Sequence, residues 1–131
     1  MNEPVERKPL ILVVDSQQEV LDAVAQVLPL TKFDCRCCNC AEVAIATAAS
    51  TPPDLIISDI NLHGHSGLQM CEQIKQHAAL TDLPVMFLSG TQIPDIIRRS
   101  DADGGTYYLR KPLDPEVLTE LVDRALAVRQ G

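Results

Sequence analysis

The 131-residue chain is short of positive charge, and it has no long apolar run. Eleven Lys and Arg residues against eighteen Asp and Glu residues give a net charge of −7, which repels a phosphate backbone and argues against nucleic-acid binding by this chain. No hydrophobic stretch approaches the roughly 20 residues that a bilayer requires, and the charged segment 1–9 contains no apolar signal sequence. Composition therefore predicts a soluble, cytoplasmic protein with no membrane contact.

Low-complexity linkers and internal repeats are also missing, so nothing in the sequence divides the chain. A chain of this length forms one ordinary domain. We expect a flexible N-terminal segment at 1–9 and a single domain at 10–131. The sequence leaves open whether this domain acts alone or as a fragment of a longer protein.

The five cysteines lack the spacing of a zinc site. Four of them lie between positions 35 and 40, without two separated Cys-x-x-Cys pairs and without a His pair at finger spacing. In a strand, Cys35 and Cys37 would share one face, and we interpret them as small buried hydrophobes. A cysteine-based metal or redox site remains the alternative, and a reducing cytosol argues against structural disulfides.

Two short aliphatic runs end in an acid. Leu10–Val14 precedes Asp15, and Leu55–Ile57 leads through Ser58 to Asp59. Continuous aliphatic runs of this length are typical of strands buried on both faces. In an open parallel sheet, the ligand crevice lies outside the carboxyl ends of the strands. Each acid therefore stands where such a sheet carries out its chemistry, although Asp is also common in ordinary turns.

The rest of the chain alternates strands with helices. Further strands are expected at 33–38, 83–89 and 106–110, with Pro84 tolerated at the first position of its strand. The expected helices start at Ser16, Asn39, Ser66, Pro94 and Asp114; Ser16 with Glu19 fits a capping box, and the Pro94 helix is short, at 95–99.

Five strand–helix units with short connections predict a doubly wound α/β fold, a (βα)5 three-layer sandwich around a five-stranded parallel sheet. The flavodoxin-like strand order 2-1-3-4-5 would place Asp15 and Asp59 in one acidic pocket.

From Leu10 to Ala127, the chain resembles the receiver domain of bacterial two-component response regulators. The similarity is carried by motifs in a specific order and spacing: Leu-Val-Val-Asp at 12–15, Asp-Leu-Ile-Ile-Ser-Asp at 54–59 with Asn61 and Gly67, Ser89 at a strand end, and Tyr-Leu-Arg-Lys-Pro at 108–112. Lys111-Pro112 resembles the cis peptide of that family. The resemblance implies a signalling domain, not an enzyme, which assists its own phosphorylation and dephosphorylation.

The resemblance also implies a role for each site residue. The domain would accept a phosphoryl group from a histidine kinase or phosphotransfer protein with the help of Mg²⁺ and would signal by conformational change. The implied assignments are Asp59 as phosphoacceptor, Asp15, Asp59 and the backbone carbonyl of Asn61 as metal ligands, Lys111 as phosphate contact, Ser89 as switch hydroxyl and Tyr108 as switch aromatic. Output domains or a homodimer partner would bind the face formed by the fourth helix, fifth strand and fifth helix.

Two positions depart from the family pattern. Ser16 stands where receivers usually carry a second metal-binding acid, so the resemblance implies weak Mg²⁺ binding. His63 replaces a usual proline, and with His65 we interpret it as a solvated loop histidine and not as a metal ligand.

Ser16 favours an alternative, a pseudo-receiver that works as an interaction module without phosphorylation. A flavin carrier of the same topology is disfavoured, because segment 16–19 has no glycine and adds an acid.

Overall fold

The computed structural model describes residues 8–77, 82–90 and 106–130. The helix expected at 95–99 and most of the expected flexible segment at 1–9 lie outside these ranges. The elements, in chain order, are β1 (Leu10–Val14), α1 (Gln18–Val27), β2 (Asp34–Cys38), α2 (Ala41–Ser50), β3 (Leu55–Asp59), β4 (Asn61–Leu62), β5 (His65–Ser66), α3 (Gly67–His77), β6 (Val85–Ser89), β7 (Thr106–Arg110) and α5 (Pro115–Gln130).

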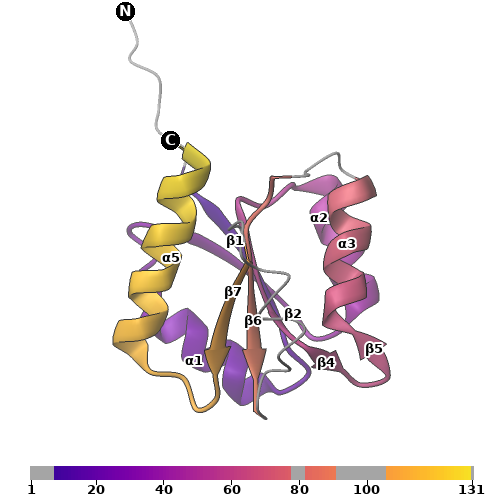
Figure 1. The fold of residues 1–131 in the computed structure, drawn as a ribbon, viewed down its shortest axis with the longest axis horizontal. Coiled ribbons are helices and arrows are strands. Elements are labelled where there is room, and N and C mark those ends of the chain that lie inside the picture. Colours follow the sequence, from indigo (N-terminus) through magenta and orange to yellow (C-terminus); the bar gives the residue numbers. More distant parts are fainter. Residues whose placement is uncertain (1–7, 78–81, 91–105, 131) are drawn as a thin grey trace, which may run out of the picture.

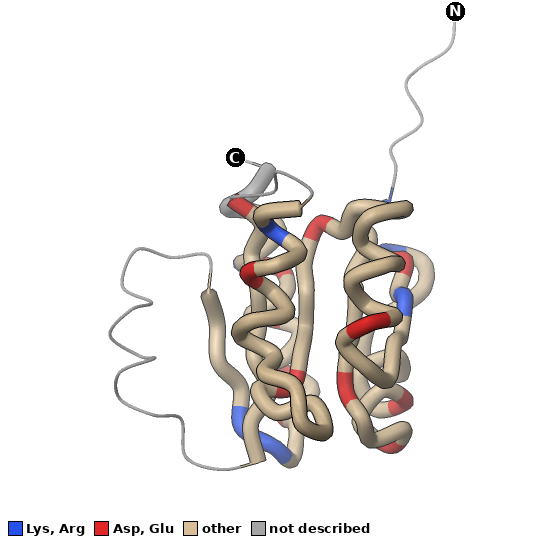
Figure 2. Tube along the Cα trace, turned by 90° about the vertical axis from the view of Figure 1, so that its right-hand side faces the viewer, with Lys and Arg blue, Asp and Glu red and all other residues tan. Residues whose placement is uncertain are grey.

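The central sheet has five parallel strands in the order β2-β1-β3-β6-β7. This is the predicted order 2-1-3-4-5 once the two short strands β4 and β5 are set aside, so the fold class is confirmed. Helices α1 and α5 lie on one side of the sheet and α2 and α3 on the other (Figure 1); Figure 2 views the molecule from the side of α2 and α3. No helix of the described ranges is long and apolar enough to cross a membrane.

The aliphatic runs form a core on both faces of the sheet. Alternate residues of β1 point to opposite sides: Ile11 and Val13 pack with α1 and α5, and Leu12 and Val14 pack with α2 and α3. All five β1 side chains and all five β6 side chains are buried. Burial of continuous aliphatic strands supplies most of the driving force for this sandwich and holds the strand ends in register.

The sequence predicts two of the described helix starts correctly. The Asp114 carboxylate accepts hydrogen bonds from the backbone amides of Glu116 and Val117 at 3.0 and 3.4 Å, and the Ser66 hydroxyl accepts one from the Gln69 amide at 3.2 Å. The caps predicted at Ser16 and Asn39 are wrong. The residues at those cap positions are Gln17 and Cys40, whose side chains make no capping hydrogen bond.

A small antiparallel hairpin, β4–β5, was not predicted. It follows Asp59 closely and pairs Leu62 with His65 across a two-residue turn. Both turn residues have positive φ, 34° at His63 and 84° at Gly64. Positive φ at both central positions is typical of the tight turn that joins two twisted strands, and glycine at the second position adopts it without strain.

The cysteine interpretation is only partly correct. Cys38 is buried and Cys35 is half-buried against the core, but Cys37 is exposed. The physical reason is that β2 is the outer strand of the sheet, where fewer neighbours cover the side chains. All five cysteines are free thiols.

Candidate functional site

Asp15 and Asp59 lie at the carboxyl ends of two adjacent strands. β1 and β3 pair in parallel with Val14 opposite Ser58, so the residue that follows each of these is an aspartate at the same edge of the sheet. The Asp15 side chain is completely buried, and the Asp59 side chain is 16% exposed. The sequence therefore predicted correctly that the two acids would be neighbours.

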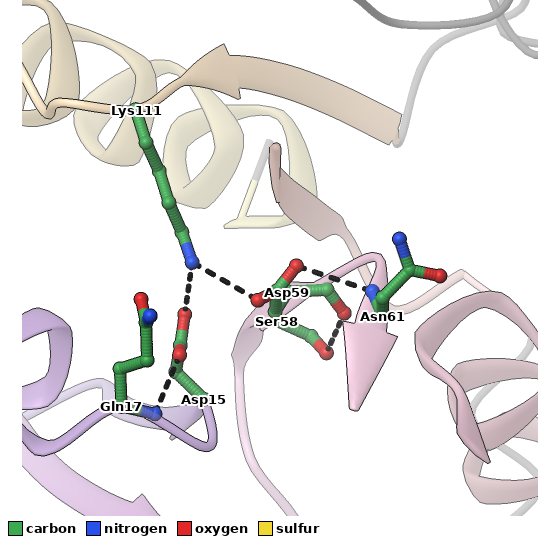
Figure 3. Close-up of polar contacts among 6 residues, drawn as sticks. All are labelled: Asp15, Gln17, Ser58, Asp59, Asn61 and Lys111. Atoms are coloured by element: carbon green, nitrogen blue, oxygen red, sulfur yellow. Dashed lines mark hydrogen bonds and ion pairs between the residues drawn. The ribbon is translucent and has the colours of Figure 1, made fainter. Parts of the chain in front are cut away.

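A lysine from the end of a third strand bridges the two acids (Figure 3). Lys111 follows β7, and its Nζ lies 2.8 Å from Asp15 Oδ2 and 2.9 Å from Asp59 Oδ2. Its backbone amide donates a hydrogen bond to the Ser89 carbonyl at 2.8 Å, and the Lys111–Pro112 peptide is cis. We call Asp15, Asp59 and Lys111 together the acidic pocket.

Charge compensation within the acidic pocket is incomplete. Two carboxylates face one ammonium group, and burial alone would lower the pKa of Lys111. Hydrogen bonds from Lys111 to Asp15 and Asp59, together with their negative charges, outweigh that effect and raise the pKa above its usual value. Lys111 is therefore charged at neutral pH, and the acidic pocket keeps an excess of negative charge that a further cation or a positively charged group would relieve.

The other carboxylate oxygens are oriented by the backbone. Asp15 Oδ1 accepts a hydrogen bond from the Gln17 amide at 2.9 Å, and Asp59 Oδ1 accepts one from the Asn61 amide at 3.1 Å. These bonds fix the rotation of each carboxylate, so both Oδ2 atoms turn toward Lys111. The Asn61 contact also brings the backbone of β4 next to Asp59.

Gly67 and Ser58 support the end of β3, and Ser58 was not among the predicted site residues. The Ser58 hydroxyl donates to the Asp59 carbonyl at 2.9 Å. A Cβ atom added at Gly67 would lie 2.0 Å from the same carbonyl oxygen. Only glycine therefore allows α3 to start against the backbone of Asp59. For Gly67, the motif was visible in the sequence, but the close approach that requires it was not.

Ser89 and Tyr108 lie beyond the acidic pocket. Ser89 is buried at the end of β6, one residue past the pairing of Leu88 with Asp59. The half-buried ring of Tyr108 stacks on Phe87 with 5.8 Å between centroids and 27° between planes, on the α3 side of the sheet. Ser89 contacts the acidic pocket through its backbone carbonyl, which accepts a hydrogen bond from the Lys111 amide, whereas Tyr108 packs against Phe87.

Oxygen ligands suited to a hard cation are present but few. Asp15 Oδ2 is buried, and within the described ranges Lys111 is its partner. No group of three or more His, Cys, Asp or Glu side chains that could hold a metal occurs among the described residues. Mg²⁺ keeps several waters and often uses only one or two carboxylates, so Asp15 and Asp59 fit a sparse Mg²⁺ site.

The two loop histidines do not join the acidic pocket. His63 is exposed in the hairpin turn. His65 reaches Glu42 of α2 instead, with Nε2 4.0 Å from the Glu42 carboxylate, and both side chains are largely exposed. A pair this open contributes little to stability.

Comparison with known proteins gives one family. Residues 11–123 match the family model for the response regulator receiver domain. Among curated proteins, the chain is 29% identical to the phosphate regulon regulatory protein PhoB of Pseudomonas aeruginosa, over 90% of this chain and 50% of PhoB. It is 32% identical to the DNA-binding dual master transcriptional regulator RpaA of Synechocystis, over 92% of this chain and 50% of RpaA. The chain thus spans about half the length of these relatives.

Solved structures agree with the same fold. The signal receiver domain of an HD domain-containing protein from Pseudomonas fluorescens superposes with a TM-score of 0.82 at 28% identity, covering 98% of this chain and 94% of that one. A putative response regulator from Chloroflexus aurantiacus gives a TM-score of 0.80 at 27% identity, covering 92% and 99%.

Proposed function

The chain belongs to the response regulator receiver domain family, and we propose that it accepts a phosphoryl group on Asp59 from a histidine kinase or phosphotransfer protein. One arrangement carries the proposal: the Lys111 ammonium group lies 2.8 and 2.9 Å from the carboxylates of Asp15 and Asp59 at the end of the sheet. A nucleophilic carboxylate with a fixed positive charge beside it suits phosphoryl transfer, in which positioning and charge stabilisation are the main tasks.

The proposed step forms one bond and breaks one. An Asp59 carboxylate oxygen attacks the phosphorus of a phosphohistidine; the P–N bond breaks, its electron pair leaves with the imidazole, and Asp59 becomes an acyl phosphate. Lys111 faces the charge on the transferred oxygens. Receiver domains generally bind Mg²⁺, which supplies further charge neutralisation; here Asp15, Asp59 and the Asn61 carbonyl would hold it. The excess negative charge of the acidic pocket is the reason to expect a cation there.

An apolar groove beside the acidic pocket is the proposed docking place for the phosphodonor. It has a volume of about 530 Å³, and α1 contributes Val20 and Ala23 while Lys111 and Leu113 line its other side. A helix carrying a phosphohistidine would place apolar side chains in this groove and its phosphate near Asp59.

Ser89 and Tyr108 would convert phosphorylation into a conformational change that other proteins can recognise. We propose that the Ser89 hydroxyl donates a hydrogen bond to the new phosphate and that the Tyr108 ring then turns inward, a packing change that a partner recognises. The face formed by β7, α5 and the helix expected at 95–99 would bind an output domain or a second copy, without nucleic-acid contact by this chain. We propose that the receiver domain spans residues 10–131 and that it works in the cytoplasm.

Intact mass spectrometry after incubation with acetyl phosphate, with and without Mg²⁺, tests the proposal. We expect one phosphate per chain, mapped to Asp59. Asp59→Asn should abolish the adduct, and Asp54→Asn, a change of the aspartate just before β3, should leave it in place. An adduct on another residue would refute the assignment of Asp59.

A pseudo-receiver is the second candidate function. Ser16, directly after Asp15, leaves the acidic pocket with two carboxylates, and Lys111 already bridges both. A pseudo-receiver would keep the fold and bind partners without phosphorylation. A complete lack of adduct in Mg²⁺, together with normal folding, would favour this function.

A further inference from the structure

The free edge of β2 carries an alternation of charges and thiols, and we infer that it pairs with the same edge of a second copy of this chain, extending the sheet into an antiparallel dimer. This inference is independent of phosphorylation, because the edge lies two strands away from β3. β2 pairs only with β1 within the described ranges. Charged residues and cysteines alternate along the first four positions of β2, which are Asp34, Cys35, Arg36 and Cys37, and the strand ends at Cys38.

The hydrogen-bonding groups of β2 divide between its two sides. The Asp34 amide donates to the Pro9 carbonyl at 3.0 Å, and the Cys38 carbonyl accepts from the Asp15 amide at 3.1 Å. In a parallel ladder, alternate residues use both backbone groups toward one neighbour, so residues 34, 36 and 38 bond to β1. The backbone groups of Cys35 and Cys37 therefore point outward, where another strand can bond to them.

The outward groups allow Cys35 to pair with Cys35, Cys35 with Cys37, or Cys37 with Cys37, and only the first register sets opposite charges across from each other. Pairing Cys35 with Cys35 of the second copy places Asp34 directly opposite Arg36, twice per dimer, and the two side chains lie on the same face of the sheet. Pairing Cys35 with Cys37 instead sets Arg36 against Arg36, which repels. Asp34 and Arg36 are both exposed, and neither forms an ion pair or a side-chain hydrogen bond with another described residue. Both are available for the partner.

The neighbouring helix is suited to approach by a second copy. A two-fold axis perpendicular to the sheet keeps α2 of both copies on the same face. α2 contacts β1 and β2, and Glu42 is its only charged residue. Its exposed positions include Val43, which is 48% exposed, and the small residues Ala46 and Ala49. An apolar helix exterior with small side chains loses little hydration and allows close packing.

The thiols report the register directly. Burial, followed by the effects of Cys37 and Asp34, raises the pKa of Cys35 to about 11, so this thiol is neutral and compatible with a covered interface. Residues that exchange both backbone hydrogen bonds lie about 5.5 Å apart between Cα atoms, within the range that a disulfide spans. Cys35 and Cys35 of the second copy would meet this condition, whereas Cys37 would face Phe33.

Charge reversal tests the interface in the otherwise native protein. Sedimentation velocity over a concentration series should show dimerisation with and without acetyl phosphate. Asp34→Arg and Arg36→Asp should each raise the dimer Kd roughly tenfold or more, because attraction becomes repulsion at two pairs, and the double swap should restore it. The matched control swaps Glu120 and Arg124, an exposed pair on α5 at 3.0 Å, and should not change Kd. A monomer at every concentration, or single reversals without effect, would overturn the inference.

Cross-linking tests the register in two further variants. One keeps Cys35 alone and the other keeps Cys37 alone, with the remaining cysteines replaced by Ser or Ala and folding checked by circular dichroism. Diamide accepts two electrons and two protons from a pair of thiols as the disulfide forms. At mildly alkaline pH, we expect a disulfide dimer from the Cys35 variant and none from the Cys37 variant. The reverse result would reject the proposed register. These outcomes do not depend on phosphorylation of Asp59, so failure here leaves the proposed function untouched.

Discussion

The two ends of β3 each carry an aspartate, but the partners of the two carboxylates differ. Asp54, just before the strand, accepts a hydrogen bond from the Leu10 backbone amide at 2.8 Å. Asp59, at the last position of the strand, meets the ammonium group of Lys111 at 2.9 Å. A backbone donor in a sheet cannot move without breaking the sheet, whereas a lysine side chain can move and leave the fold intact. Asp59 thus has one carboxylate oxygen held by the Asn61 backbone amide and the other paired with a charged side chain, which suits it to chemistry better than Asp54.

Gly67→Ala should have the largest effect, because it disturbs the Asp59 end of β3 without changing a charge. The new Cβ would lie 2.0 Å from the Asp59 carbonyl oxygen, so the backbone of α3 or β3 must shift. We expect a loss of about 4 kcal/mol in the free energy of unfolding, at the high end for single substitutions. Urea denaturation measures it. Gly90→Ala is the matched control, since no described residue apart from its chain neighbours lies within 4 Å of its added Cβ. Equal losses in both variants would contradict the steric cause.

Lys111→Met should come next, because it leaves the buried carboxylate of Asp15 without its ammonium partner. Removing one member of a buried ion pair typically costs about 3 kcal/mol. We expect a loss of this size at pH 7 by urea denaturation, together with slower labelling by acetyl phosphate. A stable variant that labels normally would show that the acidic pocket does not depend on Lys111.

The pH dependence of this difference has a definite sign. The pKa of Lys111 is raised in the folded protein, so its stabilising contribution is fully present below its ordinary value of 10.5 and is lost as pH rises through the folded value. The stability of the parent protein should therefore approach that of Lys111→Met in strongly alkaline solution. A gap that stays constant to the highest pH at which both proteins fold would contradict the role of charge.

Asp54→Asn tests the opposite end of β3 and should have a smaller effect. A hydrogen bond to a charged acceptor contributes about 2 kcal/mol, and the amide side chain still offers an oxygen to the Leu10 amide. We expect a loss of at most this size and unchanged phosphorylation. If Asp54→Asn altered labelling as strongly as Lys111→Met, the contrast between the two ends would fail.

Ser16→Asp should have the smallest effect in the absence of metal, and it should make the Asp59 end more dependent on Mg²⁺. Ser16 is not the cap of α1, so the substitution reports on the acidic pocket and not on the helix start. We expect a third carboxylate to strengthen Mg²⁺ binding by about 1 to 3 kcal/mol, a screened Coulomb estimate. Thermal unfolding across a Mg²⁺ titration, with sodium as the ionic-strength control, measures this gain. Equal Mg²⁺-dependent stabilisation of variant and parent would place Ser16 away from the pocket.

The parallel sheet and the closeness of Asp15 to Asp59 were predictable because continuous aliphatic runs ending in acids are typical of parallel strands, whose carboxyl ends meet at one edge. The helix caps were less predictable. Ser16 and Asn39 are favourable cap residues, but the helices start one residue later, with Gln17 and Cys40 at the cap positions. The β4–β5 hairpin was missed because two-residue strands leave no periodic pattern, although residues 63–64 contain a turn signal. The resemblance to the family pointed to Lys111. Its simultaneous contact with both acids depends on the register of β1, β3 and β7 within the sheet, and no local sequence pattern determines that register.

The split of β2 backbone groups between its two sides has a consequence for isotope exchange. The amide of Asp34 donates to the Pro9 carbonyl, just before β1, and the β1–β2 ladder turns the amides of Arg36 and Cys38 toward β1 as well. In an isolated copy, deuterium should therefore enter this strand at every second amide, first at Cys35 and Cys37. Protected and unprotected amides would then alternate along the same five-residue strand, so the exchange of Cys35 and Cys37 can be compared directly with that of their protected neighbours.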